Sequence, residues 1–234
     1  MRDVCGGSYA GDSTRSSCAQ SSLDRLCYPS DKVSGERRAL SVLFTNNTLA
    51  WRAGSELWVR DVCRSLVQRG HHPIAFSLVT GAVAEDLRAA TVPVVTDLDQ
   101  VSFTPDVIHG QHHLETLIAA LHFPAVPIVH VCHGWAPWEE QPLKHPSIAR
   151  YIAVDETCLD RLTTESGIPR NCVELLLNFV DLARFTRRAP LPERPRTALV
   201  FSHRADEHGY VTVIREACRP VSYTHLTLPT ICSV

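Results

Sequence analysis

The turn formed by residues 53–56, Ala-Gly-Ser-Glu, has the chemistry to hold a phosphate group. A glycine lets a ligand approach the backbone closely, and the N–H groups of a helix that begins here would point at an anion. Ser55 is predicted to cap the first turn of that helix, and Glu56 complements the positive end of its dipole. The alternative is that Gly54 only permits a tight turn, which a lone glycine does not exclude.

Histidine and cysteine side chains gather at two places that invite a metal-site interpretation, namely His130, Cys132 and His133, and His109, His112 and His113. His130 and Cys132 alternate along a predicted strand, so they would share one face as packing residues. No helical His-x3-His pair or acidic partner supports zinc, and we predict no metal. The nine cysteines include no CxxC pair, which favours reduced thiols in a cytoplasmic protein.

The elements that would position these residues alternate between strands and helices. Strands are predicted at 40–44, 74–79, 92–95, 106–109, 127–132, 150–154 and 173–177, and helices at 55–69, 82–90, 112–121 and 155–166. This alternation indicates βαβ units and a parallel sheet with both faces covered. We therefore predict an α/β fold, a Rossmann-like doubly wound parallel sheet, whose first strand-to-helix turn is where such folds hold phosphates.

The helix at 55–69 has a clear amphipathic pattern. Trp58, Val62 and Leu66 recur every four residues and predict the centre of its buried stripe, which is widened by Leu57, Val59, Cys63 and Val67. A solvent-exposed face is predicted for Arg60, Asp61, Arg64, Gln68 and Arg69. Gly70 follows at the position where a left-handed residue commonly ends a helix.

Composition excludes some classes of protein. The 234 residues are 44% hydrophobic with a net charge of −2, which gives no electrostatic case for binding nucleic acid. No run of about 18 apolar residues predicts a transmembrane helix. We expect a cytoplasmic protein, and peripheral contact with the inner face of the membrane stays open.

The chain is predicted to have five segments. Residues 1–38 lack periodicity and are expected to be disordered, 39–180 form the α/β domain, and 181–196 form a linker rich in proline and arginine. Residues 197–219 are the first strand and helix of a second α/β domain, too little to bury a core. Residues 220–234 resemble translated sequencing-adapter sequence, so we expect a non-native tail on a truncated chain.

Five segments resemble, in order and spacing, the N-terminal domain of family 4 glycosyltransferases, which are retaining GT-B enzymes. These are the glycine turn at 53–56, "PDVIH" at 105–109, the strand and His-Gly loop at 127–135, "YIAVD" at 151–155 and "NFVDLARF" at 178–185. The resemblance covers roughly residues 40–218. It implies two Rossmann-like domains facing across a cleft, with the acceptor on the first and the nucleotide sugar mostly on the second.

The activity implied by the resemblance is transfer of a sugar from a nucleotide-diphosphate donor to a hydroxyl acceptor, with retention at the anomeric carbon. The acceptor could be a glycan, a lipid or a small molecule, and neither a metal nor another cofactor is implied. Because the donor domain is incomplete, we expect little or no turnover by this chain alone.

Only a few residues carry over from the family. Gly54 matches the second glycine of the family's turn and, with Ser55, is the predicted donor-phosphate contact, although Ala53 replaces the first glycine. His133 matches the histidine of the family's His-Gly pair and is the predicted catalytic residue near the sugar. The alternative is that it is a histidine at the end of a strand whose hydrogen bonds are made by the backbone. Arg204 stands one position away from the family's diphosphate-binding arginine and is a predicted donor contact.

Several features leave other functions open. Glu139 and Glu140 are either acceptor contacts or a solvated acidic pair. The family's Glu-x7-Glu pair is absent, and Phe179 replaces a glycine of its "NGVD" turn. A non-catalytic module that binds a sugar or nucleotide, or a GT-B-type sugar epimerase, would fit the same fold. A nicotinamide dehydrogenase is disfavoured, because no GxGxxG follows Phe44.

Overall fold

The computed structural model describes residues 38–135, 138–187, 190, 193, 197–199, 212–214, 216 and 225–227. Except for Arg38, the predicted disordered segment 1–38 lies outside these residues. The chain divides into two units, residues 1–178 and 179–234. The five segment bounds predicted from the sequence stay predictions.

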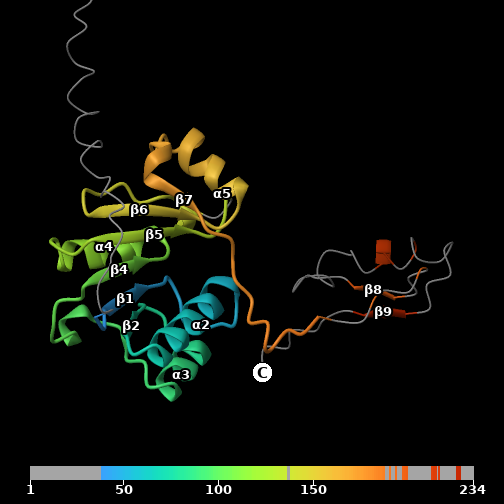
Figure 1. The fold of residues 1–234 in the computed structure, drawn as a ribbon, viewed down its shortest axis with the longest axis horizontal. Helices are drawn as coiled ribbons and strands as arrows, with labels where there is room; N and C mark the ends of the chain where they lie inside the picture. The colour runs from blue at the N-terminus through green and yellow to red at the C-terminus, as the bar shows by residue number, and fades with distance from the viewer. Residues whose placement is uncertain are drawn as a thin grey trace, which may run out of the picture. The chain divides into compact units, whose positions relative to one another are not determined.

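Seven parallel strands form one sheet in the first unit (Figure 1). They are β1 (Ser41–Thr45), β2 (His72–Phe76), β3 (Val94–Val95), β4 (Val107–Gly110), β5 (Ile128–Cys132), β6 (Ile148–Ala153) and β7 (Val173–Leu175). Their order across the sheet is β3-β2-β1-β4-β5-β6-β7. The order reverses between β1 and β4, which is the switch point of a doubly wound sheet. The predicted Rossmann-like α/β fold is therefore confirmed.

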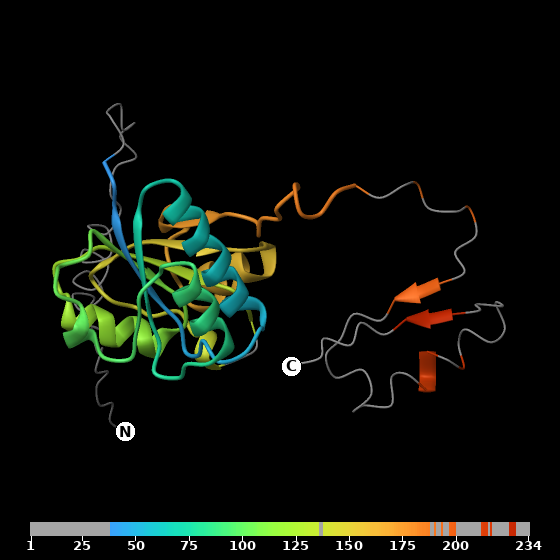
Figure 2. The ribbon, with the colours of Figure 1, turned by 90° about the horizontal axis from the view of Figure 1, so that it is seen from below.

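Helices cover both faces of this sheet. They are α2 (Gly54–Gln68), α3 (Ala82–Ala89), α4 (His113–His122) and α5 (Glu156–Asp160), and α5 continues as one π-helical turn, η3 (Arg161–Glu165). Three 3-10 turns complete the unit, η1 (Leu98–Gln100), η2 (Trp138–Glu140) and η4 (Arg170–Cys172). Figures 1 and 2 show α2 and α3 lying together against one face.

The core consists of two layers, one on each side of the sheet. Val42 and Phe44 of β1 join the layer under α2 and α3, together with Cys63. Leu43 lies between them in the sequence and joins the opposite layer, together with Ala119 of α4. Successive side chains of a strand point to opposite faces, so a strand covered on both faces is apolar throughout.

Helix α2 buries one flank of the predicted stripe more deeply than its centre. Val59 and Cys63 of that flank are buried together with Glu56 and Arg60, whereas Trp58, Val62 and Leu66 are partly buried. Arg60 was expected in solvent, but it is only 9% exposed. Its guanidinium lies 2.7 Å from the Asp61 carboxylate and 3.6 Å from that of Asp86 on α3. Because α3 packs along this flank and supplies Asp86, the arginine is buried as an ion pair.

Helix α2 ends at the predicted glycine. Gly70 has a φ of +81°. Its N–H donates to the carbonyl of Val67 at 3.0 Å, and the N–H of His71 donates to the carbonyl of Leu66 at 2.9 Å. This is the pair of hydrogen bonds of a Schellman motif, which turns the chain directly into β2.

In the second unit, β8 (Thr197–Leu199) pairs in parallel with β9 (His225–Thr227). The strand predicted to begin at Thr197 is present, and residues 212–214 and 216 are helical within the segment 197–219 that was predicted to hold the first strand and helix of this domain. Strand β9 was not predicted, because it lies in the segment interpreted as a non-native tail. Thr227 is a good strand former once β8 supplies a partner. Among the described residues, no helix is long and apolar enough to cross a membrane.

Candidate active site

The candidate site lies at the carboxyl edge of the sheet, where β1 leads to α2 and β4 leads to α4. These two helices cover opposite faces, and folds of this class bind ligands outside the strand ends at such a point. After β1, the N–H of Asn47 donates to Nδ1 of His112, which follows β4, at 3.3 Å. Around this contact lies a set of polar and aromatic side chains that we call the carboxyl-edge cluster: Trp58, His109, Gln111, His112, His133 and Glu140.

The N-terminus of α2 is open. Gly54 is the first helical residue, and a Cβ built on it meets no atom within 4 Å. The N-cap is Ala53, which has no capping side chain, so the predicted capping role of Ser55 is wrong. The Ser55 hydroxyl instead donates to the Glu56 carboxylate at 3.1 Å. Burial raises the pKa of Glu56, which favours the neutral form of this first-turn carboxyl.

His133 directly follows β5 and is held on three sides. Its backbone N–H donates to Oε2 of Glu140 at 3.1 Å, and its Nε2 hydrogen-bonds Oε1 of Gln111. The ring of Trp58 lies edge-on to the imidazole, with 5.4 Å between the centroids. Burial lowers the pKa of His133 to about 4, although the charge of Glu140 acts in the opposite direction. His133 is therefore neutral near pH 7 and suited to hydrogen bonding.

Gln111 connects His133 to a second histidine. The fully buried Gln111 places its Nε2 3.0 Å from Nδ1 of His109. The His109 ring stacks on Phe44 at 4.7 Å and lies 5.1 Å from the Trp58 ring. Burial, together with the nearby His133, lowers the pKa of His109 to about 3. Sequence reasoning missed Gln111, and no motif or periodicity singled it out.

Glu140 is buried, so its interpretation as part of a solvated acidic pair is wrong. Its Oε1 lies 3.4 Å from Nε2 of His112, while Oε2 accepts the His133 N–H. Burial raises the pKa of Glu140, but hydrogen bonds from His112 and from the His133 backbone bring it below its ordinary value overall. The carboxylate thus fixes the start of the His133 loop. The carbonyl of the neighbouring Glu139 hydrogen-bonds Nδ1 of His113 at 3.1 Å.

The loop after His133 is anchored from η3. The buried Arg161 donates to the carbonyl of Gly134 at 2.5 Å. The indole N–H of Trp135 donates to the Glu165 carboxylate at 2.8 Å. These contacts fix the backbone that directly follows His133. Trp135 remains 54% exposed.

His130 and Cys132 are packing residues, as predicted. His130 is 1% exposed and Cys132 is fully buried. The His130 ring lies edge-on to Tyr151 at 5.9 Å, and burial lowers the pKa of the imidazole to about 4. Within the described residues, no three His, Cys, Asp or Glu side chains are grouped so that they could hold a metal ion.

The predicted site residues in the first unit lie at one edge of the sheet. Gly54 and Ser55 begin α2, and Trp58 of the same helix contacts the ring of His133. The turn at Gly54 and Ser55 and the side chain of His133, which were predicted from the sequence, therefore lie near each other through Trp58. Arg204 lies outside the described residues. The roles assigned to these residues stay predictions.

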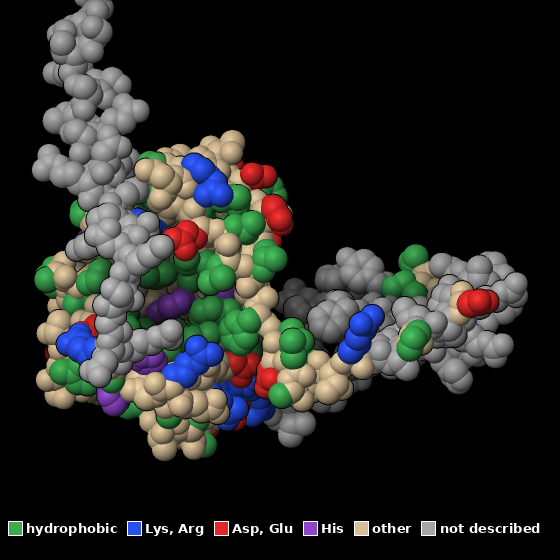
Figure 3. All heavy atoms as spheres, in the orientation of Figure 1, with side chains coloured by type: hydrophobic (Ala, Val, Ile, Leu, Met, Phe, Trp, Pro, Cys, Tyr) green, Lys and Arg blue, Asp and Glu red, His purple; other side chains and the backbone are tan. Residues whose placement is uncertain are grey.

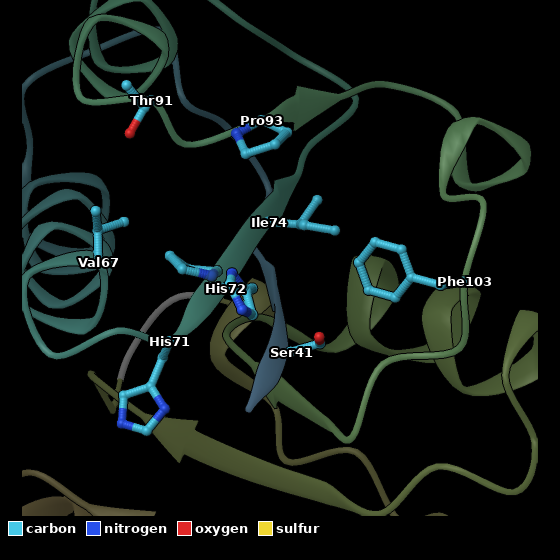
Figure 4. Close-up of a pocket in the computed structure, with 9 residues that line it drawn as sticks. Ser41, Val67, His71, His72, Ile74, Thr91, Pro93 and Phe103 are labelled. Atoms are coloured by element: carbon cyan, nitrogen blue, oxygen red, sulfur yellow. The ribbon is translucent and has the colours of Figure 1, made fainter. Parts of the chain in front are cut away.

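A pocket of about 460 Å³ lies at the opposite, amino edge of the sheet (Figure 4). Its lining includes Ser41 at the start of β1, His72 at the start of β2, and Phe103 from the connection after η1. Doubly wound folds bind ligands at the carboxyl ends of their strands, so this pocket is not our candidate site.

Charges of both signs are mixed on the described part of one face of the molecule. Over the described part of the face in Figure 3, basic and acidic side chains are interspersed, and histidines reach the surface at a few points among hydrophobic side chains. The described part of this face therefore has no continuous basic patch of the kind that binds nucleic acid.

The sheet order and the cluster at its carboxyl edge define a Rossmann-like domain of the type that builds GT-B enzymes. Residues 98–184 match the family model described as Glycosyltransferase Family 4, so this part of the chain is similar to that family. Three of the five segments that carried the resemblance lie inside the match, and a fourth overlaps its end. No curated protein matches the sequence.

Two solved structures have a similar fold. A glycosyltransferase from Rickettsia africae superposes with a TM-score of 0.58 at 11% identity, covering 82% of this chain and 68% of that chain. The glycotransferase of kitacinnamycin superposes with a TM-score of 0.53 at 12% identity, covering 82% of this chain and 65% of that one. At such identities the likeness supports the fold alone.

Proposed function

We propose that this chain carries the acceptor-side domain of an enzyme that transfers a sugar from a nucleotide-diphosphate donor to a hydroxyl acceptor, with retention at the anomeric carbon. Gly54 and Ser55 would contact the donor phosphate, and His133 would hydrogen-bond the sugar or position the acceptor. The observation that carries the proposal is the 5.4 Å ring contact between Trp58 and His133. Gly54 and Trp58 are four residues apart on α2, so they share one helix face.

The chemistry of the donor fits the N-terminus of α2. A departing diphosphate must be stabilised, and the free N–H groups of a helix N-terminus can do this without a metal. The N-cap Ala53 has no side chain that competes for those groups, and the missing Cβ at Gly54 keeps the approach open. The resemblance adds Arg204 as a further diphosphate contact, and neither a metal nor another cofactor is invoked.

The chemistry of the sugar fits His133. A neutral imidazole has one N–H donor and one lone pair, which suits it to hydroxyl groups. Its lowered pKa, about 4, keeps it in that form at neutral pH. The anchored loop and the contacts with Gln111 and Glu140 hold the ring in one place before a ligand arrives.

Calorimetric titration of the full chain with UDP-glucose, GDP-mannose and inorganic pyrophosphate tests the phosphate contact. We expect Gly54→Asp to weaken binding of all three about tenfold, roughly 1.4 kcal/mol, because the new carboxylate repels phosphate. The matched control is Gln68→Asp, which puts the same charge at the exposed far end of α2. Equal affinities for the two variants, or no binding of any probe to the native chain, would refute the assignment.

A second comparison separates sugar from phosphate. We expect His133→Ala to weaken the binding of the preferred nucleotide sugar about fivefold, the loss of one hydrogen bond of about 1 kcal/mol, and to leave pyrophosphate binding unchanged. An equal loss for both probes would mean that His133 acts only through the fold. Radiolabelled sugar transfer by this chain is expected to show little or no turnover, and robust turnover would refute that expectation.

A further inference from the structure

We infer that Gln111 is a positioning residue that couples the tautomers of His109 and His133, so that His133 carries its proton on Nε2 and offers the lone pair of Nδ1 to a substrate hydroxyl. The role toward a hydroxyl rests on the proposed function. The coupling of the two rings rests only on the contacts of the amide.

The Gln111 side chain bridges the two rings. Its Nε2 lies 3.0 Å from Nδ1 of His109, and its Oε1 hydrogen-bonds Nε2 of His133. An amide nitrogen only donates and an amide oxygen only accepts. His109 must therefore accept through Nδ1, and His133 must donate through Nε2. Both rings then carry their proton on Nε2. Rotating the amide by 180° would move both protons to Nδ1, so the rings can only change together.

The backbone of Gln111 is fixed by two buried threonines. Its N–H donates to Oγ1 of Thr45 at 3.2 Å, and its carbonyl accepts from Oγ1 of Thr116 at 3.1 Å. The two hydroxyl oxygens are 2.9 Å apart. Since the Thr116 proton goes to a carbonyl, Thr45 is the donor in that pair. The Thr116 hydroxyl also lies 2.6 Å from the His112 carbonyl, so its proton goes to one of two carbonyls. These contacts hold the backbone from which the bridging Gln111 amide extends.

The remaining nitrogen of His133 faces no protein partner among the described residues. Its Nε2 is used by Gln111, its backbone N–H by Glu140, and its ring edge by Trp58. Nδ1 makes no hydrogen bond with any described residue. The pKa values of about 4 for His133 and about 3 for His109 keep both rings neutral near pH 7, where a tautomer is defined. Nδ1 of His133 is then a pure acceptor, which matches a hydroxyl group.

Long-range 1H–15N correlation spectra of the full chain with 15N-labelled histidine, recorded at pH 7, read the protonated nitrogen of each ring. We expect both His109 and His133 as Nε2–H tautomers, with His133→Asn providing the assignment. Both rings as Nδ1–H, or one ring of each kind, would overturn the inference. The measurement needs no ligand, so failure of the proposed sugar transfer would leave it intact.

The variant Gln111→Glu separates positioning from simple packing. A carboxylate has two acceptor oxygens, so His109 must move a proton to Nδ1 while His133 keeps its proton on Nε2. The titration midpoint of His133 should also rise by about 1 to 3 pH units beside the new charge. Gln141→Glu, at an exposed position, is the matched control and should change neither ring. An unchanged His109 tautomer in folded Gln111→Glu would contradict the coupling.

The role toward a hydroxyl has its own readout. Addition of UDP-glucose or GDP-mannose, whichever binds, should shift the Nδ1 resonance of His133 more than its Nε2 resonance. A sugar nucleotide that binds and leaves Nδ1 unmoved would overturn this role, even where the tautomers are as inferred.

Discussion

Three histidines whose pKa values are lowered should make the stability of the α/β domain fall steeply between pH 6.5 and pH 4. Burial lowers the pKa of His109 to about 3 and the pKa values of His130 and His133 to about 4. In the unfolded chain each returns to about 6.5. The unfolded state therefore binds more protons across this window, so the free energy of unfolding decreases as the pH falls.

The magnitude follows from these pKa values. At pH 5, unfolding takes up about 0.9 proton per histidine and about 2.7 in all, a slope of about 3.7 kcal/mol per pH unit. Between pH 7 and pH 5, the free energy of unfolding falls by about 2 kcal/mol per histidine. The three losses together approach the whole stability of a typical domain. The raised pKa of Glu56 opposes this trend, because there the folded state binds the proton more tightly.

His130→Leu isolates one of the three titrations. His130 is buried, and its Nδ1 has no hydrogen-bond partner among the described residues. Replacing it should reduce the proton uptake at pH 5 by about 0.9 and leave the stability at pH 8 unchanged or higher, since no hydrogen bond to Nδ1 is lost. His72→Leu makes the same change at an exposed position and serves as the control.

Urea unfolding followed by circular dichroism at a series of pH values between 8 and 5 measures this dependence. The slope of the unfolding free energy against pH gives the proton uptake directly. Uptake below about one proton near pH 5.5 in the native chain would contradict the burial of the three rings. An equal loss of slope in His130→Leu and His72→Leu would show that burial is not the cause.

Two further substitutions test the packing, each by thermal and urea unfolding. Gly110→Ala should lower the free energy of unfolding by about 1 to 3 kcal/mol, because its Cβ would lie 2.6 Å from the buried Thr116 side chain. The control is Gly54→Ala, whose Cβ meets no atom and which should be neutral or stabilising. A neutral Gly110→Ala would mean that Thr116 can move. Arg60→Ala should cost about 1 to 2 kcal/mol, because it removes a buried side chain that pairs with Asp61 and Asp86, although Asp86 keeps its hydrogen bonds from Arg52. The exposed Arg64→Ala should change stability by less than about 0.5 kcal/mol. Similar losses for the two arginines would contradict the burial of Arg60.

Local sequence patterns were sufficient to predict the strands, the helices and the parallel sheet of the first unit. Apolar runs predicted the strands, and the order of strands and helices predicted the parallel sheet. Gly70 predicted the end of α2 because a left-handed residue at that position has a purely local cause. The resemblance brought in Gly54 and His133, and the chain places both at the carboxyl edge.

Contacts between distant segments could not be predicted in this way. Arg60 is buried because Asp86 approaches from α3, and the four-residue period of α2 contains no information about that helix. Glu140 is buried because His112 and the His133 backbone bind its two oxygens. Gln111 follows a strand without any motif, and only the packing of β5 beside β4 brings His133 to its amide.

Backbone strain gives an independent reason to prefer the carboxyl edge over the pocket at the amino edge. Thr91, which lines that pocket, has a φ of +62°, but it ends α3: its N–H bonds the Arg88 carbonyl and the Val92 N–H bonds the Leu87 carbonyl. A helix end accounts for this value. His112 has a φ of +34° at the start of α4, where no such cap requires it. Strain of this kind persists where the surrounding structure enforces it, and it gathers at functional sites. The contacts of His112 with Asn47 and Glu140 enforce it here, so the geometry that costs stability is the geometry that holds the candidate site together.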